Sequence, residues 1–378
     1  MTDVLLVLNT GSSSLKFEVF EYETLDRLAK GKVTGIGTEA RLCATIFQGG
    51  TPIERALAAK DHLTAMNAVI DLIDRYDDAW NLVATVHRIV HGGADFVAPV
   101  LITPEVMQRL EKLVPLAPLH QSYNLAGIAA SDRLADAPDI ACFDTAFHAD
   151  HKPLFRSFAV DAALSAKGVR RYGFHGISYE WISRVLARDH PDLARGRVVV
   201  GHLGNGASLC ALKQGKSVDT TMGMTALDGL PMGSRTGAID PGAITYMLRD
   251  LGMSVDQVEQ ELYERSGLLG LSGLSNDVKT LLESPDPRAA FALDYFALKV
   301  AQFAAMMAVS MGGMDAFVFT GGVGENAGPV RDAILSRLDF LQPFQTLVIP
   351  ANEERMLAIH GKALLESERQ RTPARQVG

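Results

Sequence analysis

The sequence predicts an α/β protein built from two duplicated domains. A length of 378 residues suits two or three domains, at roughly 150 residues each. The composition is 47% hydrophobic and only 21% charged, which is typical of packed globular proteins and excludes a disordered chain. A short hairpin pattern also occurs twice, once near the start and once in the second half of the chain.

The first hairpin covers residues 4–20. An apolar run at 4–8 ends in a polar turn at 9–14, and the chain resumes with alternating residues at 15–20. A similar pattern runs through 198–212, with its turn at 204–208. One match this short could arise by chance, but together with the length it suggests duplicated α/β halves that face each other across a cleft.

Three further strands end in sharp polar or glycine-rich turns. Residues 82–90 lead into His91-Gly92-Gly93, residues 140–143 end at Asp144, and residues 316–319 lead into a glycine turn at 320–326. Ligands of open α/β sheets bind at the carboxyl ends of strands, so we expect the site there. Amphipathic helices are predicted at 290–311 and 353–366.

Composition also excludes several functions. A net charge of −8 provides no basic field for a nucleic acid. The three cysteines form no CxxC pair and support neither a disulfide framework nor a zinc site. The apolar stretch 300–314 is shorter than the ~20 residues of a spanning helix, and the N-terminus lacks signal-peptide features. We therefore expect a cytoplasmic protein with no membrane partner.

Taken singly, most motifs allow two interpretations. Gly215-Lys216-Ser217 fails the phosphate-loop spacing, because Cys210 stands where a glycine is required, and a hairpin turn is favoured there. The turn at 9–14, followed by Lys16, is either a tight polar turn or a phosphate cradle. Arg88 and Arg235 are either structural or part of an anion clamp.

The same ambiguity holds for the remaining candidates. The glycine turn at 320–326 is either a nucleotide contact or a strand-to-helix turn eased by glycine. Asp144 could cap a helix, and His175 could be a satisfied core histidine.

In combination, ten ordered motifs resemble the acetate kinase family of acyl-phosphate-forming kinases, and the resemblance spans nearly the whole chain. The motifs lie at residues 8–17, 87–93, 115–120, 143–148, 170–176, 202–208, 219–225, 232–237, 319–326 and 352–354. So many motifs in one order favour the functional interpretation of each.

The resemblance implies two ribonuclease-H-like domains of the actin, Hsp70 and sugar-kinase superfamily around a nucleotide cleft, and a homodimer. An N-terminal lobe would take residues 1–147 plus about 354–378, and a C-terminal lobe residues 148–353. The implied reaction is the reversible, direct in-line transfer of the ATP γ-phosphoryl group to acetate, giving acetyl phosphate and ADP. A propionate kinase of the same family and a non-catalytic ATP-gated protein are the alternatives.

The resemblance also implies roles for single residues. Asp144, His175 and Arg235 would be catalytic, and Arg88 would bind the carboxylate substrate. Asn9 and Glu353 would hold Mg²⁺, with Mn²⁺ as an alternative. The implied ATP contacts are Lys16, His202, Leu203, Gly204, Asn205, Gly206, Asp277, Val278, Lys279, Gly322, Val323, Gly324, Glu325 and Asn326.

Charge explains why such a site needs cations. A short carboxylic acid has a pKa of about 4, so the nucleophile is already an anion at neutral pH and needs no general base. The anion must approach a polyanion, and like charges about 4 Å apart repel by several kcal/mol at an effective dielectric near ~20. Arg88, Arg235, His175 and Mg²⁺ would compensate for this repulsion. We therefore expect Asp144 to organise Mg²⁺, its waters or an arginine rather than to shuttle protons.

Several positions depart from the family pattern. Gln121-Ser122 replaces Asn-Pro, Tyr179 stands where histidine is usual, and Lys279 stands where arginine is common. Ala226 replaces a proline near the acyl pocket, which could ease the binding of propionate. The segment between 326 and 353 is also shorter than in typical members.

Overall fold

The computed structural model divides the chain into two compact units. It describes residues 1–11, 14–47, 52–75, 79–131 and 137–375, so residues 12 and 13 of the predicted turn lie outside the described residues. Unit 1 consists of Met1–Ala146 and Asn352–Gly378, and unit 2 of Phe147–Ala351. Glu353, which the sequence analysis assigned to the C-terminal lobe, thus groups with unit 1.

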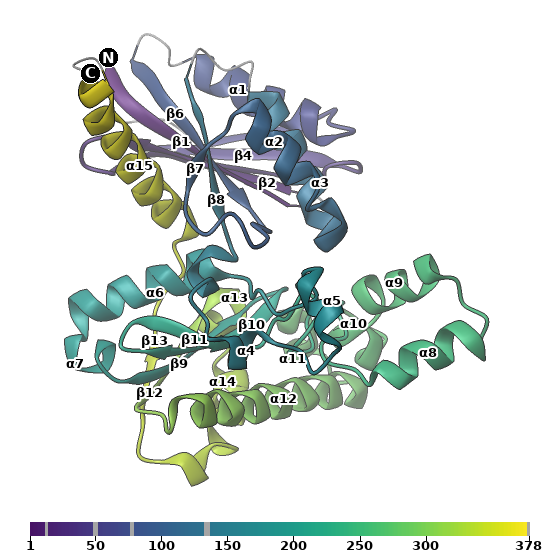
Figure 1. Ribbon diagram of the computed structural model, residues 1–378. Helices are drawn as coiled ribbons and strands as arrows, with labels where there is room; N and C mark the ends of the chain where they lie inside the picture. Colours follow the sequence, from purple (N-terminus) through teal and green to yellow (C-terminus); the bar gives the residue numbers. More distant parts are fainter. Residues whose placement is uncertain (12–13, 48–51, 76–78, 132–136, 376–378) are drawn as a thin grey trace. The chain divides into compact units, whose positions relative to one another are not determined.

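Unit 1 contains a mixed sheet of eight strands (Figure 1). Its strands are β1 (Thr2–Thr10), β2 (Ser14–Glu21), β3 (Arg27–Thr34), β4 (Ala40–Ile46), β5 (Ile53–Leu57), β6 (Trp80–Ile89), β7 (Val100–Leu101) and β8 (Asp139–Phe143), in the order β5-β4-β3-β2-β1-β6-β8-β7. β1 and β2 form the predicted antiparallel hairpin, while β6 lies parallel to both β1 and β8. Buried aliphatic side chains on β1, β2 and β3 form the core beneath it.

Helices cover both faces of this sheet. They are α1 (His62–Asp74), α2 (Pro104–Glu111), α3 (Pro118–Ser131) and α15 (Glu353–Arg375), with a short 3₁₀ helix at Val114–Leu116. In Figure 1, α15 lies on one face and α1, α2 and α3 on the other. The helix predicted at 353–366 continues to Arg375. Residues 367–372 contain neither glycine nor proline and are rich in Glu, Gln and Arg, which favour helix, so no signal stops it.

Unit 2 is built on a five-stranded sheet. Its strands are β9 (Arg197–Leu203), β10 (Ala207–Lys213), β11 (Lys216–Thr220), β12 (Ala316–Thr320) and β13 (Gln345–Val348), in the order β11-β10-β9-β12-β13. Gln214 and Gly215, with φ of 55° and 73°, form the two-residue turn between β10 and β11. Two successive positive φ values are typical of tight hairpins, so the hairpin predicted there is confirmed.

Most of unit 2 outside the sheet is helical. The helices are α4 (Pro153–Arg156), α5 (Ala162–Ala166), α6 (Gly176–Asp189), α7 (Pro191–Ala194), α8 (Pro241–Arg249), α9 (Val255–Glu264), α10 (Gly267–Ser272), α11 (Val278–Glu283), α12 (Pro287–Met311), α13 (Gly321–Asn326) and α14 (Gly328–Ser336), with 3₁₀ turns at Ala146–His148 and Asp339–Leu341. Within the described ranges, α12 is the one helix whose length and composition would allow it to cross a membrane. It packs on β9, β10 and β11 and buries one face there, as predicted for a core helix.

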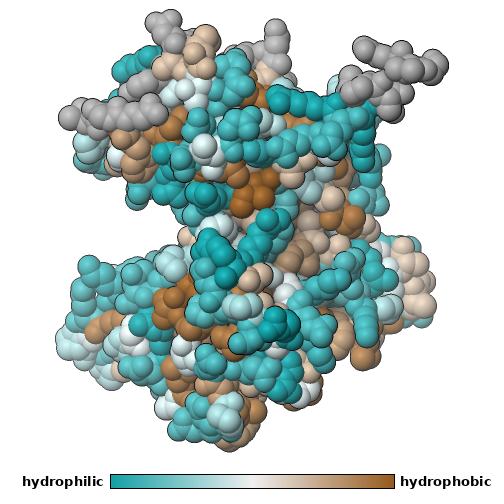
Figure 2. Space-filling model, turned by 90° about the vertical axis from the view of Figure 1, so that its left-hand side faces the viewer, coloured by the Kyte–Doolittle hydropathy of each residue, from teal (hydrophilic) through white to brown (hydrophobic). Residues whose placement is uncertain are grey.

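The two sheets share one topology, which confirms the predicted duplication. The strands β3-β2-β1-β6-β8 of unit 1 and β11-β10-β9-β12-β13 of unit 2 follow the same order. In each set, read in this order, the first two pairs of neighbouring strands are antiparallel and the last two pairs are parallel. This is the ribonuclease-H-like arrangement. On the face drawn in Figure 2 hydrophilic residues cover most of the surface, since apolar side chains fill the cores.

Candidate active-site residues

In unit 1, four predicted site residues meet where β1, β6 and β8 end. Arg88 is the second-last residue of β6, Asp144 follows β8, and Glu353 begins α15. Arg88 donates from Nε to Asp144 Oδ1 over 3.0 Å and from Nη2 to Oδ2 over 2.7 Å. Its Nη1 donates to Glu353 Oε2 over 3.0 Å and lies 3.5 Å from Asn9 Oδ1. We call these four residues the Arg88 cluster.

Burial sets the electrostatics of the Arg88 cluster. The side chains of Arg88, Asp144 and Glu353 are only 15%, 2% and 10% exposed. Burial works against the charged form of Arg88, but the carboxylates of Asp144 and then Glu353 outweigh it and raise the arginine pKa. Arg88 is therefore a permanent cation neutralised by the chain's own carboxylates. Asp144 contacts an arginine, one of the three partners that the sequence analysis expected.

The neighbourhood of the cluster includes two residues without a predicted role. Glu354 Oε1 accepts a bond from Asn9 Nδ2 over 3.3 Å. The buried Asn124 accepts from Val90 N over 3.0 Å and donates to Thr10 O over 2.9 Å, so it joins the ends of β6 and β1. Glu354 could have been found as the second acid of the 352–354 motif, whereas no signal in the sequence singles out Asn124.

Gln121, a departure from the family pattern, has a clear structural role. Its side chain is buried and exchanges two hydrogen bonds with the backbone of His91, accepting from N over 3.3 Å and donating to O over 3.2 Å. The His91 ring in turn accepts from Gly93 N over 2.9 Å. Gln121 thus fixes the glycine turn that follows the Arg88 strand.

In unit 2, the predicted catalytic His175 sits at a strained turn. It immediately precedes α6 with a left-handed backbone, φ 57°, which is uncommon outside glycine. Its Nδ1 is hydrogen bonded to Ser208 Oγ over 2.8 Å, and its ring stacks on His202 with centroids 4.3 Å apart. Tyr179 also reaches Ser208, with 2.5 Å between the two oxygens. These residues form the His175 cluster.

Two buried histidines hold the turn before His175. His148 donates from Nε2 to Phe174 O over 3.0 Å, and its Nδ1 lies 2.7 Å from Ser217 Oγ. His151 Nε2 lies 2.7 Å from the same hydroxyl. Burial lowers the pKa of His148 to about 4 and of His151 to about 3, so both rings are neutral near pH 7. His148 belongs to the 143–148 motif, but its positioning role depends on a contact the sequence does not show.

Arg235 occupies a different environment from Arg88. Its Nη1 donates to the Ala226 carbonyl oxygen over 3.1 Å and lies 3.9 Å from the Met232 sulfur. Burial lowers its pKa, although the Tyr263 hydroxyl acts in the opposite direction. Ala226, the residue that departs from the family proline, thus contacts the predicted catalytic arginine through its backbone.

The turn predicted to contact ATP at 202–206 lies against the loop before Arg235. His202 Nδ1 is bonded to Ser178 Oγ over 2.8 Å, and Gly204 N donates to Gly206 O over 3.1 Å. Gly233 N donates to Asn205 O over 3.0 Å, and a Cβ at Gly233 would clash with the Asn205 side-chain amide. Glycine at this position therefore lets the two loops approach without displacing that side chain.

The glycine turn at 321–326 forms α13 directly after β12. Glu325 Oε1 accepts from Gly321 N over 3.0 Å and from Ala351 N over 2.9 Å. Asn326 Nδ2 donates to Gly322 O over 2.8 Å, and a Cβ at Gly322 would meet nothing within 4 Å. The side chains of Glu325 and Asn326 thus stabilise the turn, and Gly322 borders open space.

The predicted contacts at 277–279 begin α11. Asp277 caps that helix by accepting from Thr280 N over 2.8 Å, a bond that lowers its pKa. Val278 is buried, and Lys279 is exposed with its ammonium 4.0 Å from Glu283. Asp277 and Lys279 are both exposed, and Lys279 is the one of the two whose side chain does not cap the helix.

Comparison with known proteins identifies the family. The model of the Acetokinase family matches residues 4–359. The chain belongs to the acetokinase family. One relative, an acetate kinase of Nitrobacter hamburgensis, is 44% identical over 96% of both chains. Another, an acetate kinase of Rhodopseudomonas palustris, is 45% identical over 90% of this chain and 87% of its own length.

Solved structures agree with this assignment. A propionate kinase from Francisella tularensis matches with a TM-score of 0.89 and 34% identity over 95% of this chain and 98% of its own. The acetate kinase of Porphyromonas gingivalis matches with a TM-score of 0.84 and 32% identity over 96% and 100%. The chain is therefore a kinase that takes ATP as its co-substrate, as the sequence analysis predicted.

The residues of this acetokinase-family member suit a magnesium ion. Across the described ranges no group of three or more His, Cys, Asp or Glu side chains is arranged to hold a metal. Mg²⁺ usually takes only one or two carboxylates and completes its shell with water and substrate phosphates. The amide oxygen of Asn9 and the carboxylates of Glu353 and Glu354 are hard oxygen donors of this kind. The donor set fits the metal.

Proposed function

We propose that this acetokinase-family member is an acetate kinase, which transfers the γ-phosphoryl group of ATP reversibly and in line to acetate, giving acetyl phosphate and ADP. The observation that carries the proposal is the Arg88 cluster, a buried guanidinium at strand ends that is held by carboxylates. The same guanidinium geometry suits a substrate carboxylate. The names of the curated relatives support acetate as the acceptor.

Arg88 and Asp144 prepare the acceptor in this proposal. Both oxygens of Asp144 accept from Arg88, so this carboxylate is engaged as a counter-ion rather than aimed as a proton acceptor. Acetate needs no general base, because it is ionised at neutral pH. Asp144 fixes the direction of the guanidinium, and the acetate anion binds its remaining N–H on Nη2.

Glu353 links substrate binding to the metal. Its Oε2 accepts a hydrogen bond from Nη1 of Arg88, and Asn9 Oδ1 lies near the same nitrogen. Mg²⁺ held by Asn9 and Glu353 would supply positive charge against the phosphate oxygens. If Glu353 turns away from Arg88, the N–H groups that it leaves can bind the acetate carboxylate. Glu353 and acetate thus compete for the same guanidinium.

His175 and Arg235 act on the phosphoryl group. Tyr179 donating to Ser208, and Ser208 donating to His175 Nδ1, leaves the ring proton on Nε2 as a donor. Arg235 adds a buried cation. Such donors stabilise charge that spreads over the equatorial oxygens of the transferring group. The ATP contacts proposed from the family are Lys16, His202 to Gly206, Asp277 to Lys279 and Gly322 to Asn326.

A propionate kinase is the second candidate. Ala226 is smaller than the usual proline and its carbonyl contacts Arg235, so an added methylene on the substrate would be tolerated there. The solved propionate kinase is similar to this chain at 34% identity.

The homodimer also belongs to this proposal. The exposed apolar side chains Phe291, Leu298, Met306 and Val309 recur at helical spacing along α12. Burial of this stripe against a second copy would remove it from water. Light scattering coupled to gel filtration tests it, and a monomeric mass at micromolar concentration would contradict it. A cytoplasmic location and the absence of nucleic-acid and membrane partners stay predictions.

A hydroxylamine trap tests the activity. Incubation of the protein with MgATP, hydroxylamine and either acetate, propionate or butyrate converts any acyl phosphate to a hydroxamate that is measured by colour. We expect the highest kcat/KM with acetate. A higher value with propionate would favour the second candidate, and no hydroxamate from any carboxylate would refute both.

A further inference from the structure

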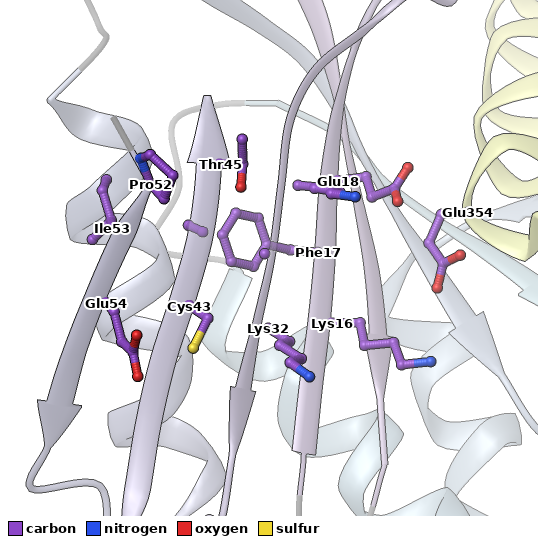
Figure 3. Close-up of a pocket in the computed structure, with 13 residues that line it drawn as sticks. Lys16, Phe17, Glu18, Lys32, Cys43, Thr45, Pro52, Ile53, Glu54 and Glu354 are labelled. Atoms are coloured by element: carbon purple, nitrogen blue, oxygen red, sulfur yellow. The ribbon is translucent and has the colours of Figure 1, made fainter. Parts of the chain in front are cut away.

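Unit 1 contains a pocket beside the Arg88 cluster, and most of the residues that line it have no role in the proposed function. Its volume is about 460 Å³, and it lies on the face of β2, β3, β4 and β5 (Figure 3). Its lining includes three lysines and three glutamates, namely Lys16, Lys30, Lys32, Glu18, Glu54 and Glu354. Opposite charges in one pocket usually pair, so the pairing pattern shows what the pocket can bind.

Strand register places two of these lysines directly opposite each other. Asn9 of the Arg88 cluster pairs with Lys16 on β2, Lys16 pairs with Lys32 on β3, and Lys32 pairs with Cys43 on β4. Residues paired across adjacent strands share one face of the sheet. In Figure 3 the side chains of Lys16 and Lys32 extend in the same direction from neighbouring strands. Their ammonium groups therefore continue the row that begins at Asn9.

Two like charges directly opposite on neighbouring strands destabilise a sheet. A nearby carboxylate would normally offset the repulsion, but in the described part of the chain neither Lys16 nor Lys32 has a carboxylate oxygen within 4.0 Å. The pocket's own glutamates contact other partners. These pairs are Glu18 with Arg27 at 2.7 Å, Glu354 with Asn9 at 3.3 Å and Glu54 with Arg41 at 3.6 Å.

Lys30 differs from the other two lysines although it lines the same pocket. It lies on β3 two residues before Lys32, and its ammonium is 5.9 Å from the ring centroid of Phe47, within cation–π distance. Its register partner on β2 is Glu18, an acid, whereas the partner of Lys32 is Lys16. The like-charge arrangement is thus specific to Lys16 and Lys32.

We propose that Lys16 and Lys32 together bind a phosphate group in this pocket, next to the Arg88 cluster. A doubly charged anion between two ammonium groups gains from both and cancels their mutual repulsion. Lys16 already belongs to the proposed ATP contacts, and Lys32 is the new residue. The proposal rests on the proposed function only for the identity of the phosphate source, which is free phosphate, acyl phosphate or nucleotide.

Titration of the full chain with inorganic phosphate, without nucleotide, tests the site by calorimetry. At a separation of about 4 Å in water-like surroundings one cation contributes about fivefold to the affinity for a single negative charge. We therefore expect Lys32→Gln to raise the phosphate Kd about fivefold or more, and Lys30→Gln to change it less than about twofold. Equal losses in both variants, or an unchanged Kd in Lys32→Gln, would overturn the proposal.

Stability provides a second readout that a purely structural role of Lys32 would not reproduce. In phosphate-free buffer of low ionic strength, we expect Lys32→Gln to melt at the same temperature as the parent chain or higher, because one of two opposed charges is gone. Added phosphate should raise the melting temperature of the parent chain more than that of the variant. A variant that melts lower without phosphate and gains equally from it would contradict the site.

Kinetics of the forward reaction, from ATP, and of the reverse reaction, from acetyl phosphate, identify the source of the phosphate group. A higher KM of Lys32→Gln for acetyl phosphate alone or for ATP alone identifies that reactant, and unchanged KM values with weaker phosphate binding identify free phosphate. If no acyl phosphate forms with any carboxylate, the proposed function fails, yet the phosphate titration still decides the pocket.

Discussion

Two buried arginines, one in each unit, have opposite electrostatics. Arg88 in unit 1 contacts the carboxylates of Asp144 and Glu353, which raise its pKa in spite of burial. Arg235 in unit 2 donates to a backbone carbonyl, and burial lowers its pKa. The first charge is neutralised by carboxylates inside the folded chain, whereas the pKa of the second is lowered because burial outweighs the opposing effect of Tyr263.

This difference in charge balance predicts how an anion binds to each arginine. A ligand that binds Arg88 must share it with carboxylates already present, so binding there is an exchange. A ligand that approaches Arg235 meets a cation in a low-dielectric setting, where each new negative charge counts more. We therefore propose that Arg88 acts in ground-state binding and that Arg235 stabilises the transition state.

Removal of the neutralised arginine should have the largest effect. Arg88→Met leaves the buried carboxylates of Asp144 and Glu353 without their counter-ion, and breaking a buried ion pair in this way costs about 3–5 kcal/mol. Urea unfolding measures the loss. Arg41→Met, which removes an exposed pair with Glu54 in the same unit, is the control, and its cost should stay below about 1 kcal/mol. Equal costs would show that the cluster is not a buried ion network.

Loss of the second arginine should affect turnover instead. We expect Arg235→Ala to lower kcat about 10²–10³-fold with a smaller change in KM for acetate, as for other donors to a developing charge. The hydroxamate assay gives both constants. Arg249→Ala, an exposed position on α8, should change kcat less than about twofold. A raised KM with normal kcat would assign Arg235 to substrate binding.

Glu18 in unit 1 is a largely buried acid, and its counter-ion Arg27 does not offset the effect of burial on its pKa. Burial raises the pKa of Glu18 from 4.5 to about 7, although Arg27 acts to lower it. The folded chain then binds a proton more tightly than the unfolded chain, so stability falls as pH rises from about 4.5 to 7 and is constant above. Glu18→Gln should remove this slope, on the order of 3 kcal/mol, in urea unfolding at several pH values. Parallel profiles of the two proteins would contradict the raised pKa.

The smallest effect is expected in the His175 cluster of unit 2. Tyr179→Phe removes one buried hydroxyl that bonds Ser208, which should cost about 1 kcal/mol of unfolding free energy. It should also lower kcat severalfold, because Ser208 no longer receives the bond that directs its own proton to His175. Nitrogen NMR of the His175 ring reports the tautomer, and Tyr246→Phe, at an exposed site, is the control. An unchanged tautomer would exclude this relay.

Much of the fold could be predicted from local patterns. The hairpins, the strands that end at His91, Asp144 and the 320–326 turn, and the buried helix all follow from hydrophobic periodicity and glycine position. The extended end of α15 was missed, because no stop signal marks residue 366. Glu353 was assigned to the other lobe because a chain crossing between units leaves no local pattern.

The sequence alone determined the duplicated fold, the family and the positions of polar turns, since these depend on local periodicity and on ordered motifs. The contacts between charged side chains follow from the tertiary structure. Arg88 and Glu353 are 265 residues apart in the chain, and their contact fixes the charge balance of unit 1. Burial decided that His148 and His151 are neutral, and strand register decided that Lys32 faces Lys16. Electrostatic energies depend on distance and dielectric surroundings, and both arise only when the chain is folded.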